Sequence, residues 1–322
     1  MKSAISMPRA SALAVIFAIV PAWPAHAQEI TLYSGALNPN NSSPWVRAWG
    51  FDYRHALGEH DAVSFEWLNE GAVRDNHRDG LAVQYWRRAQ FYDRRLSIAA
   101  GIGPYAFFNT AGGYRDDHGV GALMSVAATW YTNSRLFYEL RVNQVVAANS
   151  FDSTSVMFGL GYQFDAPRAR GPLAGGTTAS VPSGDQVTAM AGQTTVNNRG
   201  TPDALAWALE YRHGLNRYFD ATFSYLDEGS TPLSERRGVA AQLWLRRSFA
   251  GDRMSVGIGA GPYYAIERRT PDGNGSPVSL LFTMTAAYNV SRHWVARVAW
   301  NRVMTTYDKD SDVIVGGVGY RF

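Results

Sequence analysis

The chain has no cysteine, and beyond its first residues it has no long apolar run. Without cysteine it can form neither a disulfide framework nor a thiolate metal site. No later segment approaches the roughly 18 consecutive apolar residues that a transmembrane helix needs. Basic stripes and lysine clusters are also missing, so we expect no nucleic-acid partner.

The first 27 residues have the three parts of a secretory signal peptide. Lys2 and Arg9 are basic, residues 11–20 are apolar, and Ala25-His26-Ala27 matches a small-x-small cleavage site. We predict a signal peptide over 1–27, and no cysteine follows that could carry a lipid anchor. Its removal lowers the formal charge of +3 by two, to about +1.

The rest of the chain is one unit written twice. Similar segments recur at a constant spacing of 158 residues, and they begin at Tyr53 and Tyr211, Leu68 and Leu226, Trp86 and Trp244, Gly101 and Gly259, and Gly161 and Gly319. A constant offset over more than a hundred residues indicates a duplicated domain. We predict repeats over 28–164 and 186–322, joined by a Pro- and Gly-rich periplasmic linker over 165–185.

Each repeat alternates apolar and polar or small residues, which is typical of β-strands. Ile314, Gly316 and Val318, for example, alternate with Val313, Val315 and Gly317. In the first repeat we predict eight strands, over 29–36, 45–55, 61–69, 80–90, 95–108, 120–132, 135–148 and 155–164. The predicted fold class is therefore all-β, an antiparallel transmembrane barrel with one lipid-facing side per strand.

The connections alternate between short turns such as TNSR and longer polar loops such as LNEGAVRDNHRD. Outer-membrane barrels have short periplasmic turns and longer outer loops. We therefore predict that the protein lies in the cell outer membrane of a Gram-negative envelope, with outer-membrane lipid and lipopolysaccharide as its partners. Aromatic residues near strand ends, among them Trp67, Trp130 and Tyr138, are predicted to form the interfacial girdles.

The sequence allows two ways of closing the sheet into a barrel. Eight strands make a narrow barrel that side chains fill, whereas sixteen leave a channel. Bulky and small residues share the predicted inward face, with Trp86, Tyr105 and Arg141 beside Gly101 and Gly159. This favours two tandem eight-stranded barrels, with one sixteen-stranded barrel as the alternative.

The inward face also carries polar residues. The predicted polar cluster of the lumen comprises Glu66, Gln84, Trp86, Glu139 and Arg141, together with Arg297, which we align with Arg141. Ser224 stands at the place of Glu66 in the second repeat. Buried charges need partners, so we interpret the cluster as a plug.

An eight-stranded barrel that ends in GYQF at 161–164, and again in GYRF at 319–322, resembles the lipid A 3-O-deacylase (acyloxyacyl hydrolase) family. The resemblance implies a Ser nucleophile, a His base and a carboxylate near the outer rim. The candidates at the rim are Ser150, Asp152, Ser155, Asp308 and Ser311. Neither ELRVNQVVAANSFDSTS nor ARVAWNRVMTTYDKDSD contains a His, and a Ser without a base is a poor nucleophile.

We assign no catalytic residue, no metal site and no cofactor, and expect the chain not to be an enzyme. His77 and His118, on predicted outer loops, have no His at the matching place in the second repeat. The favoured function is a structural or interaction role of an outer-membrane barrel with surface loops. The alternatives are a lipid A-modifying enzyme and a channel or glycan-export pore. No protein partner is indicated.

Overall fold

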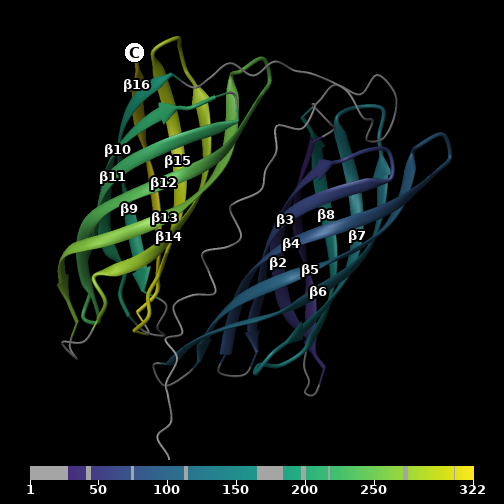
Figure 1. Ribbon diagram of the computed structural model, residues 1–322, viewed down its shortest axis with the longest axis horizontal. Coiled ribbons are helices and arrows are strands. Elements are labelled where there is room, and N and C mark those ends of the chain that lie inside the picture. Colours follow the sequence, from purple (N-terminus) through teal and green to yellow (C-terminus); the bar gives the residue numbers. More distant parts are fainter. Residues whose placement is uncertain are drawn as a thin grey trace, which may run out of the picture.

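The computed structural model describes residues 28–40, 45–73, 76–111, 115–164, 184–196, 201–216, 218–270, 275–307 and 309–322. The predicted signal peptide and nearly all of the predicted linker lie outside these residues. Every regular element in the described ranges is a β-strand (Figure 1). Within the same ranges no helix is long and apolar enough to cross a membrane.

The first repeat contains eight strands. They are β1 (Gln28–Pro39), β2 (Val46–Ala56), β3 (Asp61–Val73), β4 (Asn76–Phe91), β5 (Leu96–Ala111), β6 (Arg115–Tyr131), β7 (Leu136–Ala147) and β8 (Ser153–Gln163). The second repeat contains β9 (Asp185–Val196), β10 (Ala204–Gly214), β11 (Phe219–Ser230), β12 (Glu235–Phe249), β13 (Met254–Arg269), β14 (Val278–Asn289), β15 (Trp294–Met304) and β16 (Ser311–Arg321).

Each repeat closes on itself into an antiparallel barrel. In the first, β1 pairs with β8, with Leu32 opposite Leu160. In the second, β9 pairs with β16, with Val187 opposite Tyr320. The prediction of two eight-stranded barrels is therefore confirmed, and the alternative of one sixteen-stranded barrel is wrong.

All eight predicted strands of the first repeat are present, but several are longer than predicted. β1 ends at Pro39 rather than at 36, and β3 ends at Val73 rather than at 69. β4 begins at Asn76 rather than at 80, β5 ends at Ala111 rather than at 108, and β6 begins at Arg115 rather than at 120. These additions lie in the stretches that we predicted as polar loops. Alternation of apolar residues marks only the part of a strand that faces an apolar environment, so it misses paired ends with polar side chains on both faces.

The alternation places polar side chains inside the barrels and apolar ones outside. In β7, Leu140 and Val142 point outward and are 53% and 43% exposed. Between and beside them, Glu139, Arg141 and Asn143 point inward and are at most 1% exposed. This arrangement is the reverse of a water-soluble protein, whose core is apolar.

Glycine makes room for the largest inward side chain in each barrel. The ring of Trp86 lies against Gly101, where a Cβ atom would come within 2.6 Å of it. Trp244 lies against Gly259 in the same way. This contact explains why these two pairs recur in the sequence: a tryptophan fits across a narrow lumen only where the facing wall has no side chain.

The two barrels lie side by side, with the C-terminal end of β16 and the short turns at one end and the longer connections at the other (Figure 1). One cluster of buried apolar side chains combines residues of both barrels, including Trp67 of β3 and Phe282 of β14.

Candidate functional site

The lumen of the first barrel contains a cluster of five charged side chains, which we call the lumen cluster. Its members are Asp52, Arg54, Glu66, Glu139 and Arg141, all buried. Arg141 lies at the centre: Nη1 contacts Glu66 Oε2 at 2.8 Å, Nη2 contacts Asp52 Oδ2 at 2.8 Å, and Nε donates to Glu139 Oε1 at 2.9 Å. Arg54 binds Glu139 from the other side, at 3.1 and 3.2 Å.

Aromatic rings sandwich this cluster. The guanidinium groups of Arg54 and Arg141 lie 4.4 and 4.8 Å from the ring centre of Trp86, within range of cation–π attraction. Tyr33 donates a hydrogen bond to Glu139 at 2.9 Å. Nearby, Gln84 donates to the carbonyl of Leu123 and to Ser125. Of the lumen residues predicted in the first repeat, the structure thus brings together Glu66, Trp86, Glu139 and Arg141, while Gln84 is buried in the lumen with other partners.

Sequence reasoning missed Asp52 and Arg54. A signal was present, because Arg54 belongs to the recurring segment Tyr53-Arg54-His55 and Asp52 lies two residues before it, on the same face. A period of two places both side chains inward. Which residues meet across the lumen depends on the tilt and stagger of the strands, and alternation does not contain that information.

The second barrel has its own cluster with a different charge order. It comprises Glu210, Arg212, Asp220, Arg246 and Arg297. Arg297 binds Glu210 through two nitrogens, Arg212 binds both Glu210 and Asp220, and Arg246 Nε lies 3.1 Å from Asp220. Three cations thus share two carboxylates, whereas in the lumen cluster two cations share three.

Our alignment of Arg297 with Arg141 is wrong. Thr129 pairs with Glu139 in the first barrel, and the equivalent pair in the second is Ala287 with Arg297. Arg297 therefore occupies the place of Glu139, with the opposite charge. The error was a slip of two residues, which leaves the side chain on the same face and so cannot be detected from alternation.

Each barrel also has a second polar site, at the loop end of its own lumen. In the first it consists of Glu70, Arg78, Tyr105 and Ser153, which we call the rim quartet. Arg78 binds both carboxylate oxygens of Glu70, through Nε and, at 2.9 Å, through Nη2. Tyr105 and Ser153 each donate a hydrogen bond to the same carboxylate. All four side chains are inaccessible to solvent.

The second barrel repeats the quartet with Glu228, Arg236, Tyr263 and Ser311. Arg236 donates to Glu228 at 3.0 and 2.7 Å, and Ser311 donates to it at 2.5 Å. Arg236 also donates to the carbonyl of Lys309 at 2.7 Å, as Arg78 does to the carbonyl of Phe151 at 2.5 Å. In both barrels the arginine therefore ties the last long connection to the opposite wall.

A β-bulge aims the quartet glutamate into the lumen. The register between β3 and β4 shifts after Asn69, and Gly71 has φ of 69°. The Gly71 amide donates to the Asn69 side chain at 3.1 Å, and a Cβ atom at Gly71 would collide with the Arg47 carbonyl. Gly229 has the same conformation, with φ of 73°. This accounts for the recurrence of LNEG and LDEG, a signal that could have identified the quartet.

The predicted rim residues are separated by the structure. Ser150 accepts a hydrogen bond from Arg78, and Ser311 belongs to the second quartet. Asp152 accepts from the amide of Ala147 and so closes its own turn. Ser155 points into the lumen and is buried, and Asp308 lies outside the described residues.

The nearby histidines are engaged elsewhere. His77 contacts Asn69 and Asp79, and His118 lies 4.0 Å from Asp310. The quartet carboxylates are held by arginine, and their serines are inaccessible to solvent. This is the arrangement of a structural brace rather than of a nucleophile with its base. Among the described residues, no three His, Cys, Asp or Glu side chains gather as metal ligands would.

A scan against protein-family models found no match, and a search of curated proteins found none either. Solved structures do match. The N-terminal β-barrel domain of Pseudomonas aeruginosa OprF is 9% identical; the match covers 43% of this chain and 99% of that one, with a TM-score of 0.36. Ail, the attachment invasion locus protein of Yersinia pestis, is 12% identical, covering 43% and 97% with a TM-score of 0.31.

An outer membrane channel from Pseudomonas putida F1 is 14% identical; the match covers 94% of this chain and 98% of that one, with a TM-score of 0.23. At these identities and TM-scores the likenesses carry no inference about function. The architecture follows from the strand pairing itself. None of the three is described as a deacylase, so the resemblance to that family finds no support among them.

Proposed function

We propose that this chain is an integral outer-membrane protein whose two plugged barrels are rigid supports for their outer loops, with a structural or interaction role. One observation carries the proposal: the walls are apolar outside, while the lumens are filled by buried charged side chains. Leu140 and Arg141, neighbours in β7, are 53% and 0% exposed. In water this distribution would cost free energy on both sides of the wall, and in a lipid bilayer it is required.

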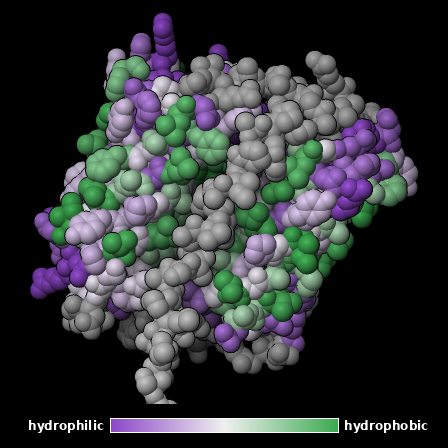
Figure 2. Space-filling model, viewed as in Figure 1, coloured by the Kyte–Doolittle hydropathy of each residue, from purple (hydrophilic) through white to green (hydrophobic). Residues whose placement is uncertain are grey.

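The outer surface supports a bilayer environment. Hydrophobic side chains cover much of the walls of both barrels, and strongly hydrophilic ones gather toward the ends (Figure 2). About ten residues of a strand tilted by roughly 40° span the apolar band of about 25 Å that such barrels have. Trp130, Tyr138 and Trp294 are exposed at the turn ends of their strands, where an aromatic girdle belongs.

The orientation follows from the connections. The turn end of each barrel also holds its first and last strand ends, and an even number of strands places these together. By the usual arrangement this end faces the periplasm and the long connections face outward. The outer leaflet, with its lipopolysaccharide, is then the immediate partner of the barrel walls.

The lumens support display rather than transport. In the first barrel the lumen cluster and the rim quartet cross the lumen at two levels, and the members of each bind one another across it. The second barrel has a charged cluster and a quartet of its own in the same places. A channel through one wide barrel has no basis, because each repeat closes separately. The quartet arginine holds the last long connection against the wall, so this part of the outer surface is presented in one conformation.

The test compares a new charge on the apolar outer wall with the same charge in a turn. Leu140→Arg places a charge in the middle of an exposed apolar face, and Ser134→Arg places the same charge in the neighbouring turn. In a bilayer-embedded barrel the first costs about 2–4 kcal/mol. The second costs only about 1 kcal/mol, for the hydrogen bond that the Leu136 amide donates to Ser134. The measurement is urea unfolding of the refolded chain in lipid vesicles, followed by the loss of heat-dependent gel mobility.

Fractionation of expressing cells provides the independent readout. The proposal predicts that the wild-type chain sediments with outer membranes and resists extraction by carbonate. A chain found in the soluble periplasmic fraction, with Leu140→Arg as stable as wild type, would overturn the proposal.

A further inference from the structure

Some side chains on the outer wall of the first barrel are not exposed at all. Trp67 points outward from β3, yet it is 0% exposed, and Phe108, which points outward from β5, is 4% exposed. Trp67 meets Trp300 edge-on with ring centres 4.6 Å apart, and stacks on Phe282 at 5.7 Å. Phe65 also meets Phe282, at 5.9 Å. The partners lie on β14 and β15, so the second barrel covers this face.

We define the seam by six residues: Phe65, Trp67 and Phe108 of the first barrel, and Phe282, Trp300 and Met304 of the second. Our prediction of Trp67 as a girdle residue is therefore wrong. A further contact joins the turn ends, where Phe249 of β12 lies 5.1 and 5.7 Å from the rings of Phe164 and Tyr162. The barrels touch at two separate places along their length.

Charged side chains close the seam at its loop end. Arg302 points outward from β15 and lies 2.7 Å from Asp312, 3.8 Å from Asp310 and 3.8 Å from Asp79 of the first barrel. Trp300 donates from its indole nitrogen to Asp312 at 3.0 Å. Arg302 and Asp79 are nearly inaccessible to solvent. Charges on a lipid-facing wall are costly, so their presence at matching heights on two walls indicates that the walls meet there.

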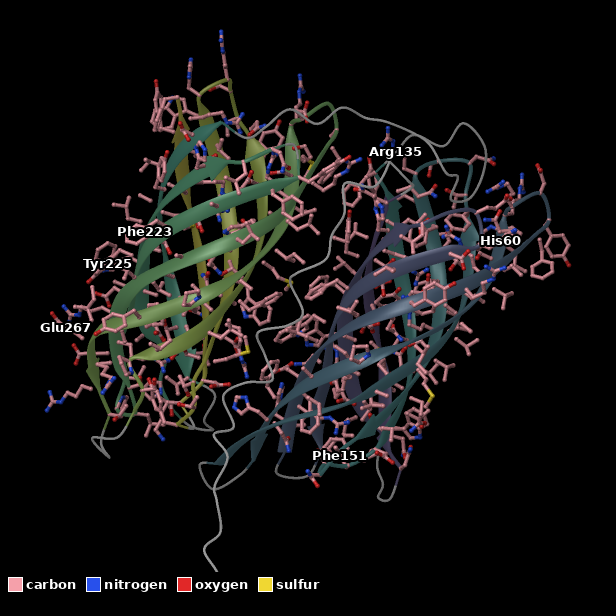
Figure 3. All side chains as sticks on the ribbon, in the orientation of Figure 1. His60, Arg135, Phe151, Phe223, Tyr225 and Glu267 are labelled. Carbon is pink, nitrogen blue, oxygen red and sulfur yellow. The ribbon has the colours of Figure 1, made fainter. Side chains whose placement is uncertain are left out.

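The duplication provides an internal comparison, because each seam residue has a counterpart 158 positions away in the other barrel. The counterparts of Phe65 and Trp67 are Phe223 and Tyr225, on the side of the second barrel away from the first (Figure 3). Phe223 is 56% exposed. The counterpart of Phe282 is Met124, which is also exposed. The seam is therefore heterologous: it joins different faces of two similar barrels.

The polar closure does not recur on the unpaired faces. Arg237 stands at the place of Asp79, and Gln144 stands at the place of Arg302. If a second copy of the chain docked through the two unpaired faces, Arg237 and Gln144 would stand in place of the attracting pair Asp79 and Arg302. On the β11–β13 face Arg237 binds Glu235 and Glu267 of its own barrel, so the charges there are paired without a second barrel.

We propose that the seam fixes the two barrels as one specific lateral pair in the membrane, in which the β3–β5 face of the first barrel recognises the β13–β15 face of the second barrel of the same chain. The inference rests on the proposed membrane location. Because the hydrophobic effect does not bring two apolar walls together in lipid, lateral association of the barrels depends on close packing and polar contacts. The stacked aromatic rings and the ions around Arg302 supply both.

The first experiment uses the absence of native cysteine. Phe65→Cys with Phe282→Cys, treated with a short bis-maleimide in isolated membranes, is expected to give an intramolecular cross-link in most molecules. The matched control is Phe223→Cys with Met124→Cys, the counterparts of the same two residues. It is expected to give no cross-link. Cross-linked dimers of the control pair would overturn the claim that the seam is specific to one chain, and an unreacted seam pair would overturn the seam itself.

The second experiment tests what holds the pair. A protease site is inserted into 165–183 of the full chain, and the folded protein is cut and purified in mild detergent through a tag on one barrel. The two barrels are expected to copurify. Trp67→Ala is expected to lower the recovered partner about tenfold, and Tyr225→Ala, its counterpart, to leave it unchanged. Equal recovery in both variants contradicts the proposal.

Heat-dependent gel mobility of each cut barrel separates two kinds of failure. If both barrels retain it but do not copurify, the seam is wrong and the membrane barrels stand. If neither retains it and the chain is soluble, the proposed function itself fails.

Discussion

Arg78 forms a two-point ion pair with Glu70 inside the first barrel, and neither side chain is accessible to solvent. The same relationship joins Arg236 and Glu228 in the second barrel. Both repeats share this polar arrangement, whereas the charges of the lumen clusters differ between them. We infer that this brace is a basic element of the duplicated unit.

Removing one partner of the brace is expected to destabilise the barrel strongly. Arg78→Met leaves Glu70 buried without its cation, which costs about 3–5 kcal/mol. The double variant Arg78→Met with Glu70→Gln removes both charges and is expected to lose much less. The free energy of unfolding in urea, followed by tryptophan fluorescence in lipid vesicles, measures both. A double variant no more stable than the single one would contradict the role of the ion pair.

Glycine at the bulge is expected to be irreplaceable. Gly71→Ala puts a Cβ atom into the Arg47 carbonyl at a positive φ, so we expect a loss of at least about 3 kcal/mol. Gly251→Ala has the same sign of φ, of 67°, but open space, and is expected to cost about 1–2 kcal/mol. Gly58→Ala, with neither constraint, is expected to be neutral. The same unfolding measurement ranks the three, and any other order is inconsistent with the bulge.

The two lumen arginines that we had aligned are expected to differ. Arg141 binds three carboxylates, so Arg141→Met is expected to cost about 3–5 kcal/mol. Arg297→Met leaves Glu210 paired with Arg212 and relieves repulsion between two cations, so we expect a loss below about 1.5 kcal/mol. Equal losses would show that the two clusters are equivalent, contrary to the strand register.

Much of the fold could be predicted from the sequence. The constant spacing of Tyr53 and Tyr211 indicated duplication, and alternation in stretches such as 313–322 placed the strands and their faces. Both signals can be read directly along the chain, and the structure confirms the strands and the two similar barrels. The separate closure of each repeat was only favoured, because the hydrogen bonds of β1 with β8 are not encoded in any one strand.

The sites were less predictable. Alternation identified Glu139 and Arg141 as inward residues, but it did not show that Asp52 and Arg54 join them across the lumen. Trp67 has the same pattern whether it faces lipid or a second barrel. In both cases the missing information is which strand lies opposite, and that depends on barrel tilt, bulges and the packing of one barrel on another.

Separate closure of each repeat within the membrane is tested most directly by disulfide formation in isolated outer membranes. Leu32 and Leu160 face each other across β1 and β8, at the Cα separation that a disulfide bridges. With separate closure, Leu32→Cys with Leu160→Cys is expected to oxidise to an intramolecular disulfide, and Leu32→Cys with Val318→Cys is not. In one sixteen-stranded barrel, β1 would lie beside β16, and the second pair would form the bond instead. That result would contradict the account.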